Sequence, residues 1–224
     1  FKILEKSYLS NKNHESSGRY GFEFAKIIKE MKSANLTKGK KQFSSIKTNQ
    51  IALDICNDII TKFPKSLGAK NCTILKNKIE EKSLSITAEK HILINTNSLL
   101  LVNYKNINKL YFSAYKVNSK QIKALNKLYK QEEKIKMISS LNKTHNWKST
   151  LRNEKDYLQH TTEIILPKFE NGEYLIVTSE NEVLKEGFIY GTTFIQATNL
   201  TLIENSFNDK HNYQIVNRNN GKPV

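Results

Sequence analysis

The spacing of apolar residues along the chain changes once, near Lys82. Before that point apolar residues recur every three or four positions, which is the period of an α-helix. This period predicts one helix over about residues 18–32 and a second over 51–63, which Pro64 ends because proline has no backbone N–H to continue it. A third helix is predicted after Ser66, whose hydroxyl suits an N-cap. The second and third helices form a hairpin whose wide apolar faces need other helices or a neighbouring domain to cover them.

After Lys82 the apolar period becomes two, which is typical of β-strands. Leu84, Ile86 and Ala88 alternate with hydroxyl-bearing residues. Further strands are predicted at residues 91–94, 99–104, 109–117, 147–151, 158–166, 173–179 and 187–197. A lysine-rich segment with helical spacing, residues 119–141, interrupts them and is predicted as one inserted helix. Many short strands separated by turn residues favour an antiparallel sandwich over a parallel βαβ fold.

The end of the chain has a third pattern. Residues 200–204 and 213–217 are strand-like and flank a turn-rich segment, so they predict a β-hairpin. We therefore expect an α+β chain with a helical region over 1–82 and an immunoglobulin-like antiparallel β-sandwich over 83–198, which includes the inserted helix. Residues 199–224 are interpreted as the truncated start of a following sandwich, in a chain excised from a longer protein.

Basic residues outnumber acidic ones by 36 to 21, which gives the 224-residue chain a formal net charge of +15. Of the basic residues 33 are lysines and three are arginines, whereas nucleic-acid readers favour the planar guanidinium of arginine. The lysines are also spread along the chain, so a solvated lysine-rich surface is favoured over an anion-binding stripe. The composition excludes a membrane-spanning helix, a disulfide-rich mini-domain, a collagen and a fully disordered tail.

The sequence carries no P-loop, GxGxxG, HExxH or GxSxG motif, and no two histidines are four residues apart. His160 could serve as a ligand or base, but a histidine at a strand edge is more often structural. Glu163 and Glu173 could pair as carboxylates for acid–base work, although their spacing defines no geometry. Trp147 is expected to anchor the core. The sequence therefore predicts no catalytic, cofactor-binding or metal-binding residue and no cofactor.

Two residue pairs in the predicted helix hairpin invite a chemical interpretation. Cys56 and Cys72 lie eight residues on either side of Pro64, so they could face each other across the hairpin. They could form a disulfide, but two buried thiols are favoured, because a free cysteine packs as a small hydrophobic residue. Asp54 and Asp58 are one helical turn apart and are expected to be solvated on one helix face beside Lys62.

Several segments follow one another in an order that resembles a known family. Residues 59–72 resemble the junction of two tetratricopeptide-type helix pairs. The later segments are Ser83–Ile86, Val102–Asn106, Lys109–Val117, Tyr157–Ile164 and Gly172–Val177. Their order resembles the N-terminal part of bacterial alpha-2-macroglobulin-like proteins, the Bacteroides-type large envelope proteins. Residues 193–200 resemble the exit strand of one macroglobulin-type sandwich, and residues 218–223 resemble a recurrent turn in the next.

This resemblance implies tetratricopeptide-like helices followed by a macroglobulin (MG2-type) β-sandwich in the periplasm or cell envelope. It implies a non-enzymatic scaffold in the inhibition or trapping of endopeptidases. Many members of the family carry a thioester in a Cys-x-Glu-Gln motif, but neither Cys56 nor Cys72 begins such a motif. The expected partners are therefore proteases, bound through other parts of the parent chain, and the rest of the macroglobulin chain itself. No nucleic acid and no membrane span are expected.

Two other classes of function stay open. A tetratricopeptide-like groove could make the chain a protein-binding or adhesion module of a bacterial surface protein, because helix pairs of that type bind peptides on a concave face. The net charge of +15 could instead make it a binder of nucleic acid or another anionic polymer, with an affinity that falls steeply with salt.

Overall fold

The chain forms two compact units. In the computed structural model the described residues are 2–30, 45–207 and 210–224. The helical unit comprises Phe1–Lys82 and Asn153–Gln159, and the sandwich unit comprises Ser83–Arg152 and His160–Val224. Helices followed by largely antiparallel sheets confirm the predicted α+β fold with a β-sandwich. Residues 31 and 32, at the end of the first predicted helix, lie outside the described residues.

Helices build the helical unit. They are α1 (Lys2–Ser10), α2 (Ser17–Glu30), α3 (Ser45–Lys62) and α4 (Leu67–Glu80). The last three of these confirm the predicted helices, whereas the apolar spacing did not predict α1. A helix of nine residues is marginal by itself in water. It is held by packing, because Tyr8 is buried and its ring centroid lies 6.2 Å from that of Phe24 in α2.

Small residues set the start of α4 and its packing on α2. The Ser66 hydroxyl accepts a hydrogen bond from the Ala69 backbone N–H at 3.0 Å, which confirms the predicted N-cap. Gly68 lies so close to Gly18 of α2 that a β-carbon on Gly68 would overlap the Gly18 backbone. The buried core around this contact consists of Tyr8, Phe24, Ala25, Ile28, Ala52, Leu53, Ile55, Cys56, Ile59, Ala69, Cys72, Leu75 and Ile79.

A short segment from the later part of the chain, Asn153–Gln159, completes the helical unit. The buried Asn49 side chain of α3 donates hydrogen bonds to the backbone carbonyls of Asp156, at 2.9 Å, and of Tyr157, at 3.4 Å. The Asp156 carboxylate accepts the Leu158 N–H at 2.9 Å and so closes a tight turn. Tyr157 has a φ of 59°, in a region that bulky residues rarely adopt, so these hydrogen bonds hold a strained turn.

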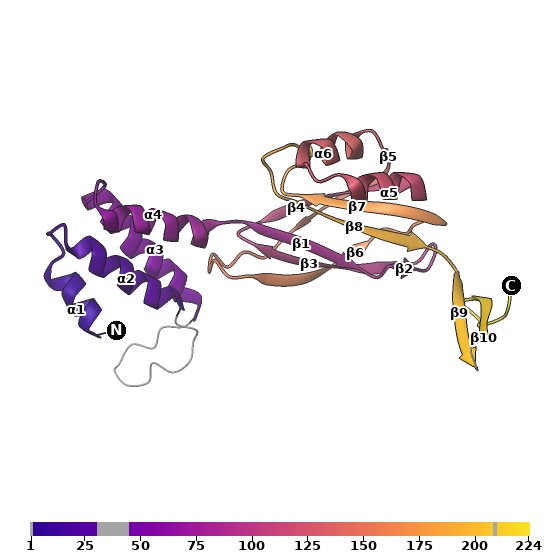
Figure 1. Ribbon diagram of the computed structural model, residues 1–224, viewed down its shortest axis with the longest axis horizontal. Coiled ribbons are helices and arrows are strands. Elements are labelled where there is room, and N and C mark those ends of the chain that lie inside the picture. The colour runs from indigo at the N-terminus through magenta and orange to yellow at the C-terminus, as the bar shows by residue number, and fades with distance from the viewer. Residues whose placement is uncertain (1, 31–44, 208–209) are drawn as a thin grey trace. The chain divides into compact units, whose positions relative to one another are not determined.

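The sandwich unit has two facing sheets (Figure 1). The three-stranded sheet has the order β1 (Ser83–Ala88), β3 (Ser98–Lys105) and β6 (His160–Leu166). The five-stranded sheet has the order β2 (His91–Ile92), β8 (Tyr190–Ala197), β7 (Gly172–Ser179), β4 (Lys109–Val117) and β5 (Asn142–Thr150). Neighbouring strands are antiparallel except β2, which pairs parallel to β8 over two residues.

Aromatic and aliphatic residues from both sheets fill the space between them. On β4 the alternation is clear, because Leu110, Phe112 and Ala114 belong to this core. Trp147 of β5 stacks on Phe112 with ring centroids 5.2 Å apart and an interplanar angle of 10°. The structure therefore places Trp147 against the core, as expected for an anchor.

The lysine-rich insertion forms two helices, where a single one was predicted. Helix α5 (Ser119–Lys127) begins at Asn118, which forms a reciprocal capping box with Gln121. Helix α6 (Gln131–Ser139) follows a three-residue break. Both helices lie on the outer face of the five-stranded sheet (Figure 1). The break lets both short helices place apolar residues on the same cluster, which includes Leu125 and Ile138.

Strand β5 begins at Asn142, five residues before the predicted start at Trp147. Its first half is polar and exposed, so it lacks the alternation that marks a half-buried strand. It is an edge strand, and its ladder to β4 shows a register shift at Ala114 and Tyr115. The first half of β5 is a strand because its backbone pairs with β4, and hydrophobic spacing in the sequence does not reveal such pairing.

The predicted hairpin is present as β9 (Leu200–Phe207) and β10 (Lys210–Asn217), which pair antiparallel over eight residue pairs. The cross-strand pair Leu202 and Ile215 is exposed on one face of this hairpin. Its interpretation as the start of another sandwich stays a prediction. Among the described residues, none of the helices combines the length and apolar character needed to cross a bilayer.

Candidate functional site

The structure does not bring the predicted acid–base candidates into one site. Glu163 lies on β6 of the three-stranded sheet, whereas Glu173 lies on β7 of the other sheet and accepts a hydrogen bond from the Ser119 hydroxyl at 3.3 Å. His160 starts β6, and its ring lies 5.7 Å from that of Tyr104 in β3. No cluster of three or more potential metal-ligating side chains occurs within the described ranges.

The acidic pair on α3 has two different environments. Asp54 is exposed and accepts a hydrogen bond from Gln50 at 2.9 Å. Asp58 contacts the Lys62 ammonium at 2.8 Å and accepts the Tyr8 hydroxyl at 2.9 Å. Burial alone would raise the pKa of Asp58, but the hydrogen bonds from Lys62 and Tyr8 outweigh it and lower that pKa. The predicted position of Asp58 beside Lys62 is confirmed, but the prediction missed Tyr8, through which Asp58 ties α1 to α3.

The two cysteines are free thiols, both fully buried in the core of the helical unit. A hydrogen bond between the Cys56 and Cys72 thiols, together with burial, raises the pKa of Cys72. The structure thus has the two buried thiols that the sequence favoured over a disulfide. The same hydrogen bond lowers the pKa of Cys56, but both side chains are fully buried, so the fold keeps solvent-borne reagents away from either sulfur.

A groove of about 180 Å³ runs between α2 and α4 of the helical unit. Phe22 and Leu75 supply apolar surface, and Ile74, 68% exposed, stands beside them. Lys26 and Lys29 line the α2 side. Lys78 and the carboxylate of Glu30 also line it, so three ammonium groups and one carboxylate border the apolar strip. This excess of positive charge suits a partner with apolar and acidic side chains.

A second hollow, of about 230 Å³, lies on the outer face of the five-stranded sheet; we call it the sheet hollow. Tyr111, Ser113 and Tyr115 of β4 and Val177 and Ser179 of β7 belong to its floor. The remaining lining residues are Ser139, Leu141, Lys143, Asn181, Glu182, Val183 and Leu184. The strand predicted over residues 109–117 implies that Tyr111, Ser113 and Tyr115 share a face, because side chains alternate along a strand, but it could not show that a hollow forms over them.

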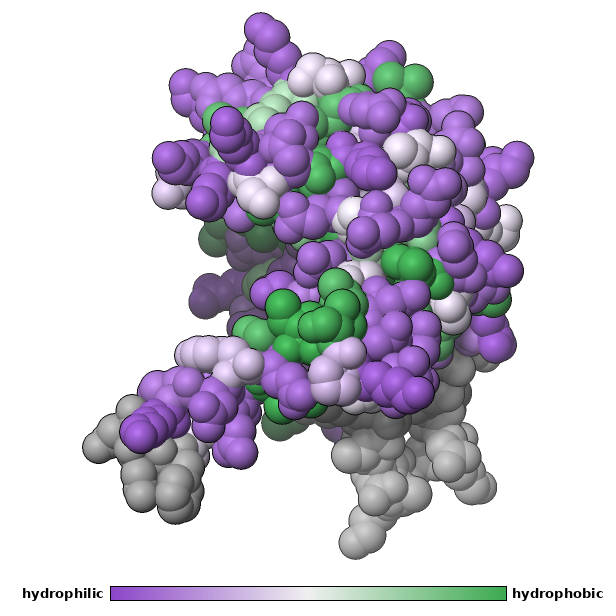
Figure 2. Space-filling model, turned by 90° about the vertical axis from the view of Figure 1, so that its right-hand side faces the viewer, coloured by the Kyte–Doolittle hydropathy of each residue, from purple (hydrophilic) through white to green (hydrophobic). Residues whose placement is uncertain are grey.

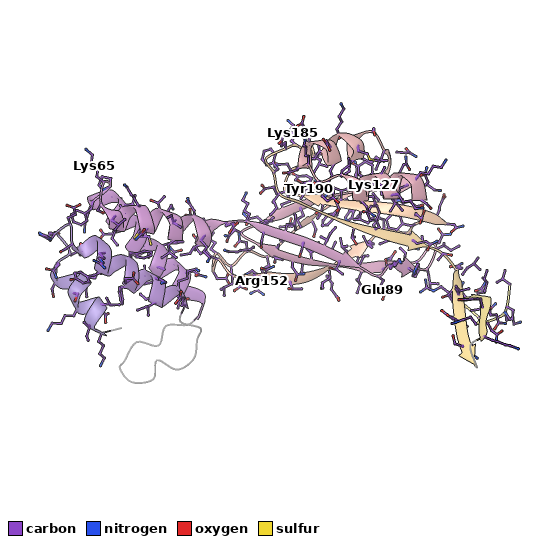
Figure 3. All side chains as sticks on the ribbon, viewed as in Figure 1. Lys65, Glu89, Lys127, Arg152, Lys185 and Tyr190 are labelled. Atoms are coloured by element: carbon purple, nitrogen blue, oxygen red, sulfur yellow. The ribbon has the colours of Figure 1, made fainter. Side chains whose placement is uncertain are left out.

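The two tyrosines of this floor each lie beside a lysine. The Lys109 ammonium lies 4.7 Å from the ring centroid of Tyr111, and the Lys143 ammonium lies 5.6 Å from that of Tyr115. Such cation–π contacts hold a lysine near an aromatic face without removing its charge. Figure 3 shows Tyr190 on the side of the sheet that α5 and α6 cover, where it packs against their apolar cluster.

Hydrophilic side chains prevail on the face shown in Figure 2, and hydrophobic ones form small separate groups. The predicted solvated lysine-rich surface, as against one basic stripe, stays a prediction.

No protein-family model matches the chain, and no curated protein matches it. Among solved structures, a fragment of native alpha-2-macroglobulin from Escherichia coli spanning domains MG0-NIE-MG1 is similar with a TM-score of 0.46 and 14% identity, over 64% of this chain and 48% of that one. This chain thus spans about half of that fragment. The NIE-MG1 fragment of the same protein gives a TM-score of 0.42 and 11% identity, over 65% of this chain and 74% of that one.

A CARDB domain of the PF1109 protein from Pyrococcus furiosus, solved in complex with di-metal ions, gives a TM-score of 0.29 and 13% identity, over 52% of this chain and 92% of that one. All three TM-scores lie below 0.5, so none of these similarities assigns the chain to a family.

Proposed function

We propose that this chain is a non-catalytic module of an alpha-2-macroglobulin-like protein of the bacterial envelope, where it supports the trapping of endopeptidases by the parent chain. One observation carries the proposal. The five sequence segments that resemble the family fall on, or run into, strands of a single sandwich that follows a helical unit. Those strands are β1, β3, β4, β6 and β7.

The mechanism in this proposal is steric. A filled core between two sheets makes the sandwich unit a stiff spacer, because close-packed interiors transmit force with little compression. The chain also passes three times between the two units, at Lys82–Ser83, Arg152–Asn153 and Gln159–His160. A module connected in this way can hold other parts of a parent chain in place without performing chemistry itself.

The test uses the full-length protein from its native source, mixed with endopeptidases of different specificity. A steric trap lowers cleavage of a large substrate such as azocasein while it leaves cleavage of a short chromogenic peptide intact. Residues 1–224 alone should protect neither substrate and should show no turnover of their own. Equal cleavage of azocasein with and without the full-length protein would refute trapping, and turnover by the isolated chain would refute the non-catalytic role. Fractionation of the native cells tests the proposed envelope location.

The groove between α2 and α4 favours a second candidate function, a protein-binding module. A labelled synthetic peptide with leucines on one helix face and glutamates on the other is the probe. The variant Ile74→Asp should weaken binding, because Ile74 lines the groove. The matched control is Leu67→Asp, since Leu67 is on the same helix with the same 68% exposure but does not line the groove. Equal binding by both variants would reject the groove.

The expected absence of a nucleic-acid partner stays a prediction. Filter binding of the full chain to duplex and single-stranded DNA across a salt series tests it. Affinity that falls steeply with salt would favour the anionic-polymer alternative, because released counterions would then drive the binding.

A further inference from the structure

The two cysteines of the sequence lie on two helices that pack against each other. Cys56 is on α3 and Cys72 is on α4, and the two positions lie eight residues on either side of Pro64. Helices α3 and α4 form a helix hairpin, in which positions equally far from the turn lie at the same level. The hairpin therefore brings together two thiols that are distant along the chain.

The two sulfur atoms are in contact inside this hairpin. Both cysteines are fully buried in the same core cluster, and their thiols share a hydrogen bond. Small residues of the same cluster precede them, Ala52 on α3 and Ala69 on α4, so the side chains around the two sulfurs leave room for the helices to approach closely. A disulfide needs its two sulfurs about 2.05 Å apart, which thiols already in contact reach by a small movement.

We propose that Cys56 and Cys72 are a disulfide site, which a small or protein disulfide oxidant closes while the helical unit folds, and which then fixes α3 to α4. The structure describes the reduced state of this site. The inference rests on the proposed function only for the source of the oxidant, because disulfides form and persist in the bacterial periplasm and on cell surfaces, whereas the cytosol keeps thiols reduced. It does not depend on the trapping of endopeptidases.

The bond forms in two exchange steps. The thiolate of one cysteine attacks a sulfur of the oxidant's disulfide, which gives a mixed disulfide and releases one oxidant thiolate. The thiolate of the other cysteine then attacks the cysteine sulfur of the mixed disulfide, which forms the bond between Cys56 and Cys72 and releases the second oxidant thiolate. Two electrons pass from the cysteines to the oxidant, and the two thiol protons end on the released thiols. Because the folded chain buries both sulfurs, these steps take place before the core closes or when it opens locally.

The experiment refolds the full chain from urea in a buffer of oxidised and reduced glutathione, and in parallel in reductant alone. The oxidised product should be a monomer that is lighter by two hydrogen atoms, and after denaturation neither cysteine should react with Ellman's reagent. Because the bond closes a loop of about 15 residues, the melting temperature of the helical unit, followed by circular dichroism at 222 nm, should be about 10 °C higher than in the reduced chain. Two reactive thiols per chain, glutathione adducts, disulfide-linked dimers or an unchanged melting temperature would each overturn the proposal.

Two single variants separate the bond from other effects of the buffer. Cys56→Ala and Cys72→Ala each leave one thiol, so the melting temperature of either variant should be the same in both buffers. A rise in the variants equal to that in the unmodified chain would overturn the proposal. The folded reduced chain should also react with oxidised glutathione about ten-fold or more slowly than the refolding chain, because its sulfurs are enclosed. Equal rates would overturn closure during folding. Since the buffer supplies the oxidant, these results are independent of the cell fractionation that tests the envelope location.

Discussion

The helical unit and the sandwich unit are stabilised in different ways. In the helical unit, close packing depends on small residues. Gly18 and Gly68 let two helix backbones approach each other, and Ala25 and Ala52 are fully buried. In the sandwich unit, large side chains such as Phe112 fill the space between two sheets. Added volume should therefore damage the first unit most, and removed volume the second.

The chain carries a built-in way to follow the two units separately. Trp147 is the single tryptophan of the sequence, and it packs against the sandwich core. Its fluorescence reports unfolding of the sandwich unit. Circular dichroism at 222 nm reports mainly the helices, most of which belong to the helical unit. Urea titrations that record both signals can then assign a loss of stability to one unit or the other.

The largest effect is expected for Phe112→Ala. Phe112 is 1% exposed and stacks on Trp147, so truncation leaves a cavity between the sheets. The free energy of unfolding should fall by about 3–5 kcal/mol, measured from the fluorescence transition. Phe188→Ala serves as the control, because Phe188 is 39% exposed and should change stability little. Similar losses in the two variants would contradict a sandwich unit that depends on filled volume.

The second effect concerns added volume in the helical unit. Gly68→Ala places a β-carbon onto the Gly18 backbone, which cannot turn aside as a side chain could. We expect a loss of about 3 kcal/mol, at the upper end for overpacking, in the circular dichroism transition. Gly191→Ala in the sandwich is the matched control, since its β-carbon would meet Ile86 and Thr178 at ordinary contact distances of 3.4–3.5 Å. A Gly68→Ala chain as stable as Gly191→Ala would show that α2 and α4 can separate freely.

The third effect tests how the later segment is fixed in the helical unit. Asn49→Ala removes the amide that donates to the Asp156 and Tyr157 carbonyls, so the free energy of unfolding should fall by about 1–2 kcal/mol. Asn57→Ala makes the same change of helix propensity at an exposed position of α3. Proteolysis should also become faster within Asn153–Gln159 in the first variant alone. Identical stability and cleavage in the two variants would argue against a role of Asn49 in fixing this segment.

The regularity of burial explains which elements the sequence could predict. Regular alternation on Leu84, Ile86 and Ala88 identified a strand, because one face of β1 packs against the core. Helix spacing and the Ser66 cap identified α4 for a similar reason. Periodicity reports burial, so it finds elements whose burial is regular.

Elements that depend on long-range contacts escaped prediction. The first half of β5 is exposed and is a strand because β4 lies beside it. The docking of Asn153–Gln159 depends on one buried asparagine more than a hundred residues earlier, which no local pattern marks. The sheet hollow is hidden for the same reason: its lining comes from β4, β5, β7, the end of α6 and the segment after β7, and only the fold brings these together.

The smallest expected effect is the pH-dependent contribution of Asp58 to the stability of the helical unit. Hydrogen bonds from Lys62 and Tyr8 lower the pKa of Asp58 in the folded chain. Because an unfolded aspartate titrates near pH 3.9, Asp58 adds stability above that pH and loses it as the pH falls through the lowered folded value. The contribution is below about 1 kcal/mol, since the side chains of Asp58 and Lys62 are 29% and 35% exposed. The gap in unfolding free energy between the unmodified chain and Asp58→Asn should therefore shrink from pH 7 to pH 3. Asp54→Asn removes the same charge from an exposed position on α3 and serves as the matched control. A gap for Asp58→Asn that stays constant over this range would mean that the carboxylate does not link α1 to α3.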